Sequence, residues 1–148
     1  MSTERDMTQP LETMDTDPLV KAALAARERA IAPFSGFRVG AALETASGEI
    51  VTGCNIENAT YGLTLCAERV ALFKALSEGH RAFRRVAVVA DAVEPTPPCG
   101  ACRQLLWEFA GDIEVVLAGP AGRASRLQLA DLLPLPFDGR FLGRGDRP

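Results

Sequence analysis

The sequence lacks the features of several common protein classes. No hydrophobic run approaches the roughly 20 residues that a membrane-spanning helix needs, and the polar, acidic start has no apolar stretch of the kind found in signal peptides. Glycine-rich phosphate loops of the Rossmann and Walker types are absent. There is no excess of basic residues, since the net charge is −3, and aromatic residues make up 6% of the chain. Nucleic acids and anionic membranes are therefore not expected as partners.

The chain holds one histidine and four cysteines. A single histidine disfavours hydrolytic triads, which are built on that residue. Without a signal peptide the protein is expected in the cytoplasm, where thiols stay reduced. The cysteines are therefore expected to be metal ligands, catalytic groups or buried thiols rather than a disulfide framework.

Length and composition predict one globular domain. The chain has 148 residues, of which 47% are hydrophobic, and a domain of this size can bury a core without disulfides. Residues 1–16 are polar, lack periodicity and hold all three methionines, so a flexible N-terminal tail is expected there. The single domain is expected over residues 17–137, and a loose tail rich in glycine and arginine over 138–148.

The order of the predicted elements indicates the fold class. A helix is expected to begin with Asp17 as N-cap and Pro18 in the first turn, and to end at Pro33. Two strands joined by a hairpin turn are expected at 37–45 and 49–57. Further helices are expected at 66–79, 99–110 and 130–133, and further strands at 85–91, 113–117 and 123–127. A hairpin followed by strands that alternate with helices is typical of the α/β class, here with a mixed five-stranded sheet and helices packed on both faces.

Three cysteines stand at the openings of predicted helices. Cys66 opens one helix, and Cys99 and Cys102 lie in the first turn of another. Helix N-termini favour thiolates, and three thiolates can hold Zn²⁺ while leaving a fourth position open, as in catalytic zinc sites. Glu68 follows Cys66 by two residues and can act as a general acid and base at that position. The combination of C-A-E with a later P-C-x-x-C is the signature of zinc-dependent deaminases.

Other readings of these residues remain open at this point. The C-x-x-C segment alone would also suit a redox dithiol. Cys54 would be the fourth ligand of a structural zinc site, but strand alternation places it on the face opposite Asn55 and Glu57, so Cys54 is expected in the core. A zinc module without catalytic activity would not need Glu68. Taken alone, Phe37 is more often a core residue than a substrate contact.

Four segments carry a resemblance to a known family. They are residues 33–43, 53–58, 66–69 and 98–104, within a similarity that runs from about Arg29 to Phe137. Together they resemble the small homotetrameric cytidine deaminases. The resemblance implies a cytidine deaminase-like three-layer sandwich and one Zn²⁺ per chain.

The resemblance also implies roles for individual residues. Cys66, Cys99 and Cys102 would bind Zn²⁺, and Glu68 would move protons. Substrate contacts are implied for the ribose at Asn55 and Glu57, for the pyrimidine at the Ala67 backbone N–H, for the base at Phe37, and for a neighbouring subunit's site at Tyr61 and Phe137. Arg69 would donate hydrogen bonds to the zinc thiolates.

The expected function is zinc-dependent hydrolytic deamination of cytidine and deoxycytidine, with release of ammonia, in pyrimidine salvage. An amide and a carboxylate at positions 55 and 57 match sugar hydroxyls, and the carboxylate would repel a phosphate, so a nucleoside fits better than a nucleotide. Deamination of another small base or nucleoside, such as guanine or blasticidin, is the alternative with the same zinc chemistry. Editing of RNA or DNA would need basic and aromatic surface that this composition does not supply.

Overall fold

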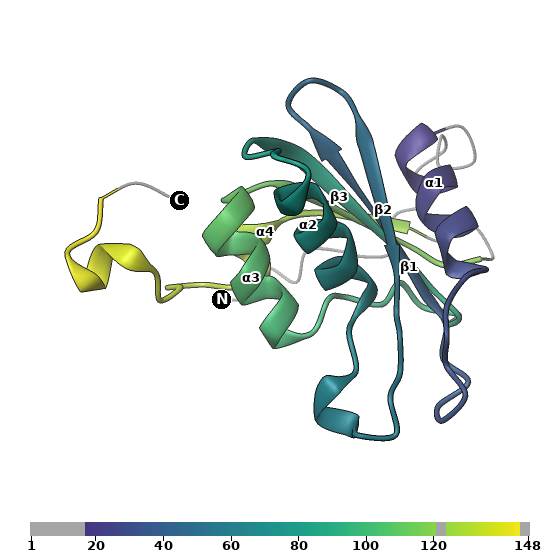
Figure 1. Ribbon diagram of the computed structural model, residues 1–148. Coiled ribbons are helices and arrows are strands. Elements are labelled where there is room, and N and C mark those ends of the chain that lie inside the picture. The colour runs from purple at the N-terminus through teal and green to yellow at the C-terminus, as the bar shows by residue number, and fades with distance from the viewer. Residues whose placement is uncertain (1–16, 121–123, 146–148) are drawn as a thin grey trace, which may run out of the picture.

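A mixed five-stranded sheet forms the centre of the protein (Figure 1). The computed structural model describes residues 17–120 and 124–145. The strands are β1 (Val39–Thr45), β2 (Ile50–Cys54), β3 (Phe83–Ala90), β4 (Glu114–Ala118) and β5 (Ala124–Gln128), in the order β2-β1-β3-β4-β5. Only β3 and β4 pair in parallel, with α3 as the crossover between them; the other pairs are antiparallel.

Helices cover both faces of this sheet, which confirms the predicted fold class (Figure 1). One face carries α1 (Pro18–Arg27), and the other carries α2 (Ala67–Ser77) and α3 (Gly100–Ala110). Successive sheet residues serve opposite cores, because side chains alternate along a strand. Val86 and Val88 pack with α2 and α3, whereas Ala87 and Val89 pack with α1. The shorter helices are α4 (Leu129–Leu132), η2 (Tyr61–Leu63) and η3 (Gly139–Leu142).

The first helix begins as predicted but ends earlier than predicted. The Asp17 side chain caps it by accepting a hydrogen bond from the Leu19 N–H at 3.0 Å. The predicted end at Pro33 is wrong, since α1 ends at Arg27. The chain then turns so that Ile31 forms a β-bridge with Ile56, a contact between distant residues that helical periodicity does not reveal.

Two glycines allow helices to approach the sheet closely. A Cβ atom at Gly40 would overlap the Ala23 carbonyl oxygen in α1, and one at Gly53 would lie 2.5 Å from the Ala67 carbonyl oxygen in α2. The backbone of α2 therefore rests directly on β2 at its first turn. This contact positions the start of α2, where Cys66 and Glu68 lie.

The predicted tails are covered only in part. Residues 1–16 lie outside the described residues, as do 146–148 at the end of the second predicted tail. After Phe137 the chain forms η3, whose N-cap Asp138 accepts hydrogen bonds from the Arg140 N–H and from the Trp107 indole at 2.9 Å. Trp107 packs against the core from a half-buried position beside η3.

Replacing Asp17 with alanine is expected to lower the free energy of unfolding by about 2 kcal/mol at neutral pH, the upper range for loss of an N-cap. The Arg85 guanidinium, 2.6 Å away, holds the pKa of Asp17 below its ordinary value of 3.8. A carboxylate with a depressed pKa stabilises the fold above its ordinary pKa and loses that effect as pH falls through the lowered value. Urea denaturation from pH 7 to pH 2.5 should show a constant difference between parent and variant down to about pH 4, and a shrinking one below.

The matched control is Glu28→Ala at the other end of α1. Glu28 also forms an ion pair, with Arg27 at 2.7 Å, but its side chain is exposed. Exposed pairs contribute about 0–1 kcal/mol, so this variant should resemble the parent. A difference between parent and Asp17→Ala that stays the same down to pH 2.5 would contradict the assigned ion pair.

Candidate metal and substrate site

Three cysteines meet where α2 and α3 begin. Cys66 and Cys99 are the N-cap residues of α2 and α3, and Cys102 lies in the first turn of α3. Their sulfur atoms lie within 4.8 Å of one another, and the Cys66 and Cys99 Sγ atoms are 3.8 Å apart. Tetrahedral zinc with Zn–S bonds of about 2.3 Å requires sulfur atoms about 3.8 Å apart. The cluster therefore fits a zinc ion.

Within the described ranges, 17–120 and 124–145, the cluster holds three cysteines and no further ligand. Cys54 is the remaining cysteine, and it stands half-buried at the end of β2, outside the cluster. The expectation that Cys54 lies in the core is wrong, because β2 is the edge strand of the sheet and its end is partly open. Three ligands leave one tetrahedral position for water or substrate, which is the arrangement of catalytic zinc sites.

The sulfur cluster favours negative charge at Cys66. The Cys102 thiol hydrogen-bonds to Cys66 and lowers the pKa of Cys66, and Cys99 and the Arg69 cation act in the same direction. The same contact with Cys66, together with burial, raises the pKa of Cys102. The Arg69 Nη2 atom lies 4.0 Å from the Cys66 Sγ. The structure thus places Arg69 beside the thiols, where its positive charge offsets theirs.

Glu68 lies in the first turn of α2 and is 5% exposed. Burial raises the pKa of its carboxyl group, and the negative charge on Cys66 raises it further. The carboxyl group also contacts the Cys102 thiol, so it lies at the cluster without being needed as a ligand. Ala67, which precedes it, is the first residue of α2, and its N–H is one of the amides at a helix start that have no partner within the helix.

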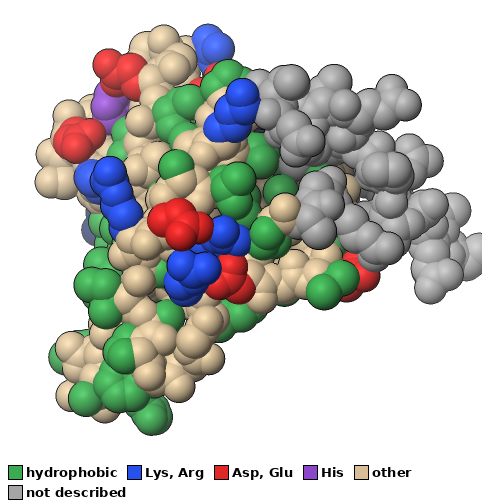
Figure 2. Space-filling model, turned by 90° about the vertical axis from the view of Figure 1, so that its right-hand side faces the viewer, with side chains coloured by type: hydrophobic (Ala, Val, Ile, Leu, Met, Phe, Trp, Pro, Cys, Tyr) green, Lys and Arg blue, Asp and Glu red, His purple; other side chains and the backbone are tan. Residues whose placement is uncertain are grey.

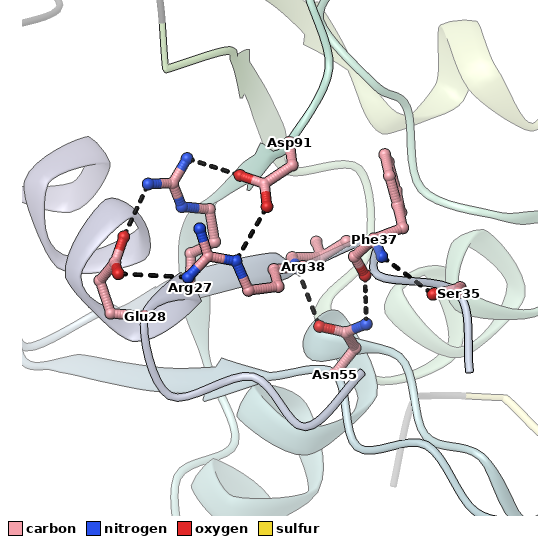
Figure 3. A network of polar contacts seen from close by, with 8 residues as sticks. Arg27, Glu28, Ser35, Phe37, Arg38, Asn55 and Asp91 are labelled. Atoms are coloured by element: carbon pink, nitrogen blue, oxygen red, sulfur yellow. Dashed lines mark hydrogen bonds and ion pairs between the residues drawn. The ribbon is translucent and has the colours of Figure 1, made fainter. Parts of the chain in front are cut away.

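Asn55 holds the chain that enters β1. Its Oδ1 accepts from the Val39 N–H, and its Nδ2 donates to the Phe37 carbonyl oxygen, both at 2.8 Å (Figure 3). Asn55 is buried, whereas Phe37 is 37% exposed. The side chain amide therefore fixes the backbone on both sides of Arg38 and with it the orientation of Phe37.

A network of ion pairs braces the same entry from the other side (Figure 3). Asp91, just after β3, binds Arg27 of α1 at 2.8 Å and Arg38 at 2.9 Å, and Arg38 also pairs with Glu28. This network was not predicted from the sequence. Its members are scattered along the chain, and no local motif joins them.

Glu57 organises the loop before β1. Its carboxylate accepts from the Phe34 N–H at 2.9 Å, from the Ser35 N–H at 3.1 Å and from the Ser35 hydroxyl at 2.5 Å. The hydrogen bond from the Ser35 hydroxyl, followed by those from the two amides, lowers the pKa of Glu57, which keeps it ionised. A depression of about 370 Å³ opens here, lined by Phe34, Ser35, Glu57, Tyr61 and Thr64. The contact of Ser35 with Glu57 was not predicted from the sequence.

Two aromatic residues with implied roles at a neighbouring site are exposed in the chain. Tyr61 is 74% exposed, and its ring meets the Phe34 ring edge-on, with 5.8 Å between the ring centres. Figure 2 shows hydrophobic side chains gathered at the lower end of the molecule, where the loops project. Phe137 is 59% exposed and stacks on Phe141 at 5.6 Å. In Figure 1 the yellow chain beyond α4 projects to the left past α3, whereas the teal loop before α2 lies at the bottom of the view. One chain therefore does not bring these two rings together.

Replacing Asn55 with alanine is expected to raise KM for a nucleoside by about tenfold to a hundredfold, the usual range for losing a buried polar contact worth about 1–3 kcal/mol. The variant would free the Phe37 carbonyl and the Val39 N–H, so the loop before β1 should also become mobile. Steady-state kinetics and hydrogen exchange of residues 34–39 would measure the two effects. The control is Asn58→Ala, whose exposed side chain accepts from the Thr60 N–H. Unchanged kinetics in Asn55→Ala would contradict the ribose contact that the resemblance implies for Asn55.

Comparisons with known proteins agree with this geometry. The family described as "Cytidine and deoxycytidylate deaminase zinc-binding region" matches residues 14–118. A cytidine deaminase of Halalkalibacterium halodurans is 51% identical over 125 residues, which cover 84% of this chain and 95% of the relative. One of Sporosarcina psychrophila is 49% identical over 84% of this chain and 92% of the relative. A blasticidin-S deaminase of Bacillus cereus is 34% identical over 67% of this chain and 76% of the relative.

A solved structure shows the same architecture. The cytidine deaminase of Burkholderia pseudomallei superposes with a TM-score of 0.78 at 51% identity, over 80% of this chain and 96% of that protein. Within the ranges that the structure describes, none of the helices combines the length and hydrophobicity that a membrane crossing needs. The family predicted from the four segments is thereby confirmed: this chain belongs to the cytidine and deoxycytidylate deaminase family, hydrolases that act on C–N bonds.

Proposed function

We propose that this protein catalyses the zinc-dependent hydrolysis of cytidine and deoxycytidine to uridine and deoxyuridine, with release of ammonia. The observation that carries the proposal is the three-sulfur cluster with one open tetrahedral position and the buried Glu68 beside it. Identity of about half with several cytidine deaminases supports the same activity. The proposed metal is one Zn²⁺ per chain, held by Cys66, Cys99 and Cys102.

The proposed chemistry assigns proton transfer to Glu68. When bound, Zn²⁺ supplies Lewis-acid chemistry that makes hydroxide available from water near neutral pH. Glu68 takes the proton of the attacking water and delivers it to N3 of the pyrimidine as the new C4–O bond forms. Glu68 then takes the second proton of that water from the new C4 hydroxyl and gives it to the departing amino group, so the C4–N bond breaks, the C4 carbonyl forms and ammonia leaves. One buried carboxyl group can serve each transfer because it alternates between its charged and neutral forms.

Other residues of the chain tune and orient the reaction. Three thiolates and a divalent cation carry a net charge of −1, and the Arg69 cation and the two helix N-termini offset it. The Ala67 N–H is proposed to bind the pyrimidine, and Phe37 to pack against it. Asn55 and Glu57 are proposed to bind the ribose.

A nucleoside is the proposed substrate class. Glu57 is ionised and lines the depression near the loop before β1, so a phosphate there would meet a negative charge. Deamination of blasticidin S is the second candidate, because a relative with that name is 34% identical. The amide of Asn55 and the carboxylate of Glu57 match the hydroxyl groups of a sugar, which favours the nucleoside.

We also propose an oligomeric state, a cellular location and a metabolic role for the protein. Tyr61 and Phe137 are exposed, and the loop before α2 and the chain beyond α4 lie at different ends of the molecule in Figure 1, which supports a homotetramer in which each residue completes a neighbour's site. Light scattering after size exclusion would test this, since a mass near 15.8 kDa would exclude it. We place the protein in the cytoplasm and in pyrimidine salvage, because its thiols must stay reduced to bind metal.

The test of the function is a substrate panel with ammonia release as the readout. The zinc-loaded protein is assayed with each of these compounds in turn: cytidine, deoxycytidine, cytosine, cytidine monophosphate, adenosine, guanine and blasticidin S. Cytidine and deoxycytidine should be turned over, and the monophosphate should react far more slowly. Preference for blasticidin S or guanine would replace the proposed substrate, and no ammonia from any of them would overturn the proposal.

A further inference from the structure

Among the three thiols of the cluster, Cys99 has the least packing around it. Cys102 is 1% exposed and Cys66 is half-buried, whereas Cys99 is exposed. The chain reaches Cys99 through the proline-rich loop 95–98, which has no regular hydrogen bonding. As the N-cap residue of α3, Cys99 also makes no capping hydrogen bond with its side chain. Something other than packing must therefore hold the Cys99 sulfur in place.

Arg103 binds the backbone on both sides of Cys99. Its N–H donates to the Cys99 carbonyl oxygen at 3.0 Å, and its side-chain Nε donates to the carbonyl oxygen of the buried Pro98 at 2.7 Å. Its Nη1 donates at 2.8 Å to the carbonyl oxygen of Leu132, which is the last residue of α4. The guanidinium group holds its Nε and Nη1 donors in one fixed plane. The side chain therefore sets the distance between the backbone at Pro98 and the backbone at Leu132.

The neighbouring residues of α3 hold the chain that follows α4. Gln104 Nε2 donates to the Phe137 carbonyl oxygen at 2.7 Å, and the Trp107 indole donates to Asp138 at 2.9 Å. Residues 132–138, which we name the C-terminal strap, are thus attached to α3 by the side chains of Arg103, Gln104 and Trp107. The first attachment, through Arg103, is the one whose side chain also binds the carbonyl oxygen of Pro98, the residue before Cys99.

We infer that Arg103 is a positioning residue for Cys99 and couples the zinc cluster to the C-terminal strap. The inference rests on the zinc site of the proposed function. Without the guanidinium, the carbonyl of buried Pro98 would lose this donor, and the loop would shift to find another. The Cys99 sulfur would then leave its position opposite Cys66 more often, so a bound metal would dissociate faster.

The experiment measures how fast zinc leaves the purified, zinc-loaded protein. Transfer to a chromophoric chelator in excess gives the release rate without any substrate. Arg103→Ala should release zinc about ten- to a hundredfold faster than the parent, the range known for partners that orient metal ligands. Arg103→Lys keeps the charge but offers no planar pair of donors, so it should stay closer to Arg103→Ala than to the parent.

Two control variants separate positioning from general stability. Arg81 also binds two backbone carbonyls, those of Leu76 and His80, both at 2.8 Å, but at the far end of α2. Arg81→Ala should release zinc at the parent's rate even if its Tm falls. Gln104→Ala loosens the strap near Phe137 and leaves Arg103 in place, so it should raise KM and leave the release rate unchanged.

The outcomes distinguish this inference from the proposed function. Release from Arg103→Ala at the parent's rate overturns the positioning role, and equal acceleration in Arg81→Ala does the same, because the effect would then follow stability. A parent protein that retains no zinc after purification in zinc overturns the zinc site itself. A parent that retains zinc and deaminates cytidine, with no change in Arg103→Ala, rejects only the inference.

Discussion

Replacing Glu68 with glutamine is expected to lower the turnover number by at least about a hundredfold to ten thousandfold, the range for one general acid–base group. Glutamine has nearly the same shape, so the buried position in α2 can hold it, but it neither accepts nor releases a proton in this role. Zinc content should stay at about one ion per chain, since the three sulfur atoms are unchanged. Turnover from initial rates and zinc from atomic absorption are measured on the same sample.

The matched control is Glu78→Gln. Glu78 is the C-cap residue of α2, on the same helix but at the end away from the cysteines. This variant should turn over cytidine as the parent does. Parent-like turnover in a zinc-loaded Glu68→Gln protein would remove Glu68 from the mechanism.

Replacing Cys102 with serine is expected to weaken zinc binding by about a hundredfold or more. Binding of structural zinc by four ligands contributes about 10–16 kcal/mol, so each ligand contributes about 3 kcal/mol on average. A hydroxyl group is not ionised at neutral pH and is a poor zinc ligand, and Cys102 is too deeply buried for water to take its place easily. Competition with a chelator of known affinity measures the zinc dissociation constant.

Cys54→Ser is the control for that experiment. It removes a thiol from the same protein, but Cys54 lies outside the cluster at the end of β2. Its zinc affinity should equal that of the parent. Equal losses in both variants would show that serine acts through stability, and full zinc retention in Cys102→Ser would contradict the ligand assignment.

Elements with local signals could be predicted from the sequence, and elements set by distant contacts could not. The cap at Asp17 is a local signal and lies where expected, and α2 ends at Ser77, close to the expected end at residue 79, where Gly79 has a positive φ. The end of α1 depends on Ile31 pairing with Ile56, 25 residues further along, so helical periodicity alone extended the helix too far. The second strand was likewise expected to reach Glu57, but β2 ends at Cys54. Beyond it, the backbone carbonyl of residue 55 and the N–H of residue 57 hydrogen-bond to Ile31 instead of continuing along β1.

The candidate site also combines residues that have a local sequence signal with residues whose contacts are distant in the sequence. The cysteines and Glu68 stand at helix starts, where spacing already implies a common position, and the structure brings them together. The partners of Asn55 and Glu57 were not foreseen, because both side chains bind backbone groups, which carry no sequence signal. Arg103 was hidden for the same reason: its side-chain partners are carbonyl oxygens.

The way the sulfur atoms are assembled has a consequence for how the protein matures. Cys66 and Cys99 are 33 residues apart, and β3, which pairs with β1 and β4, lies between their helices in the chain, so we expect their sulfur atoms to meet only once these strands have paired. Metal capture is therefore a late event, so zinc should slow unfolding far more than it speeds folding. In a cell short of zinc, newly made chains would collect as folded apoprotein, ready to be activated when the metal returns.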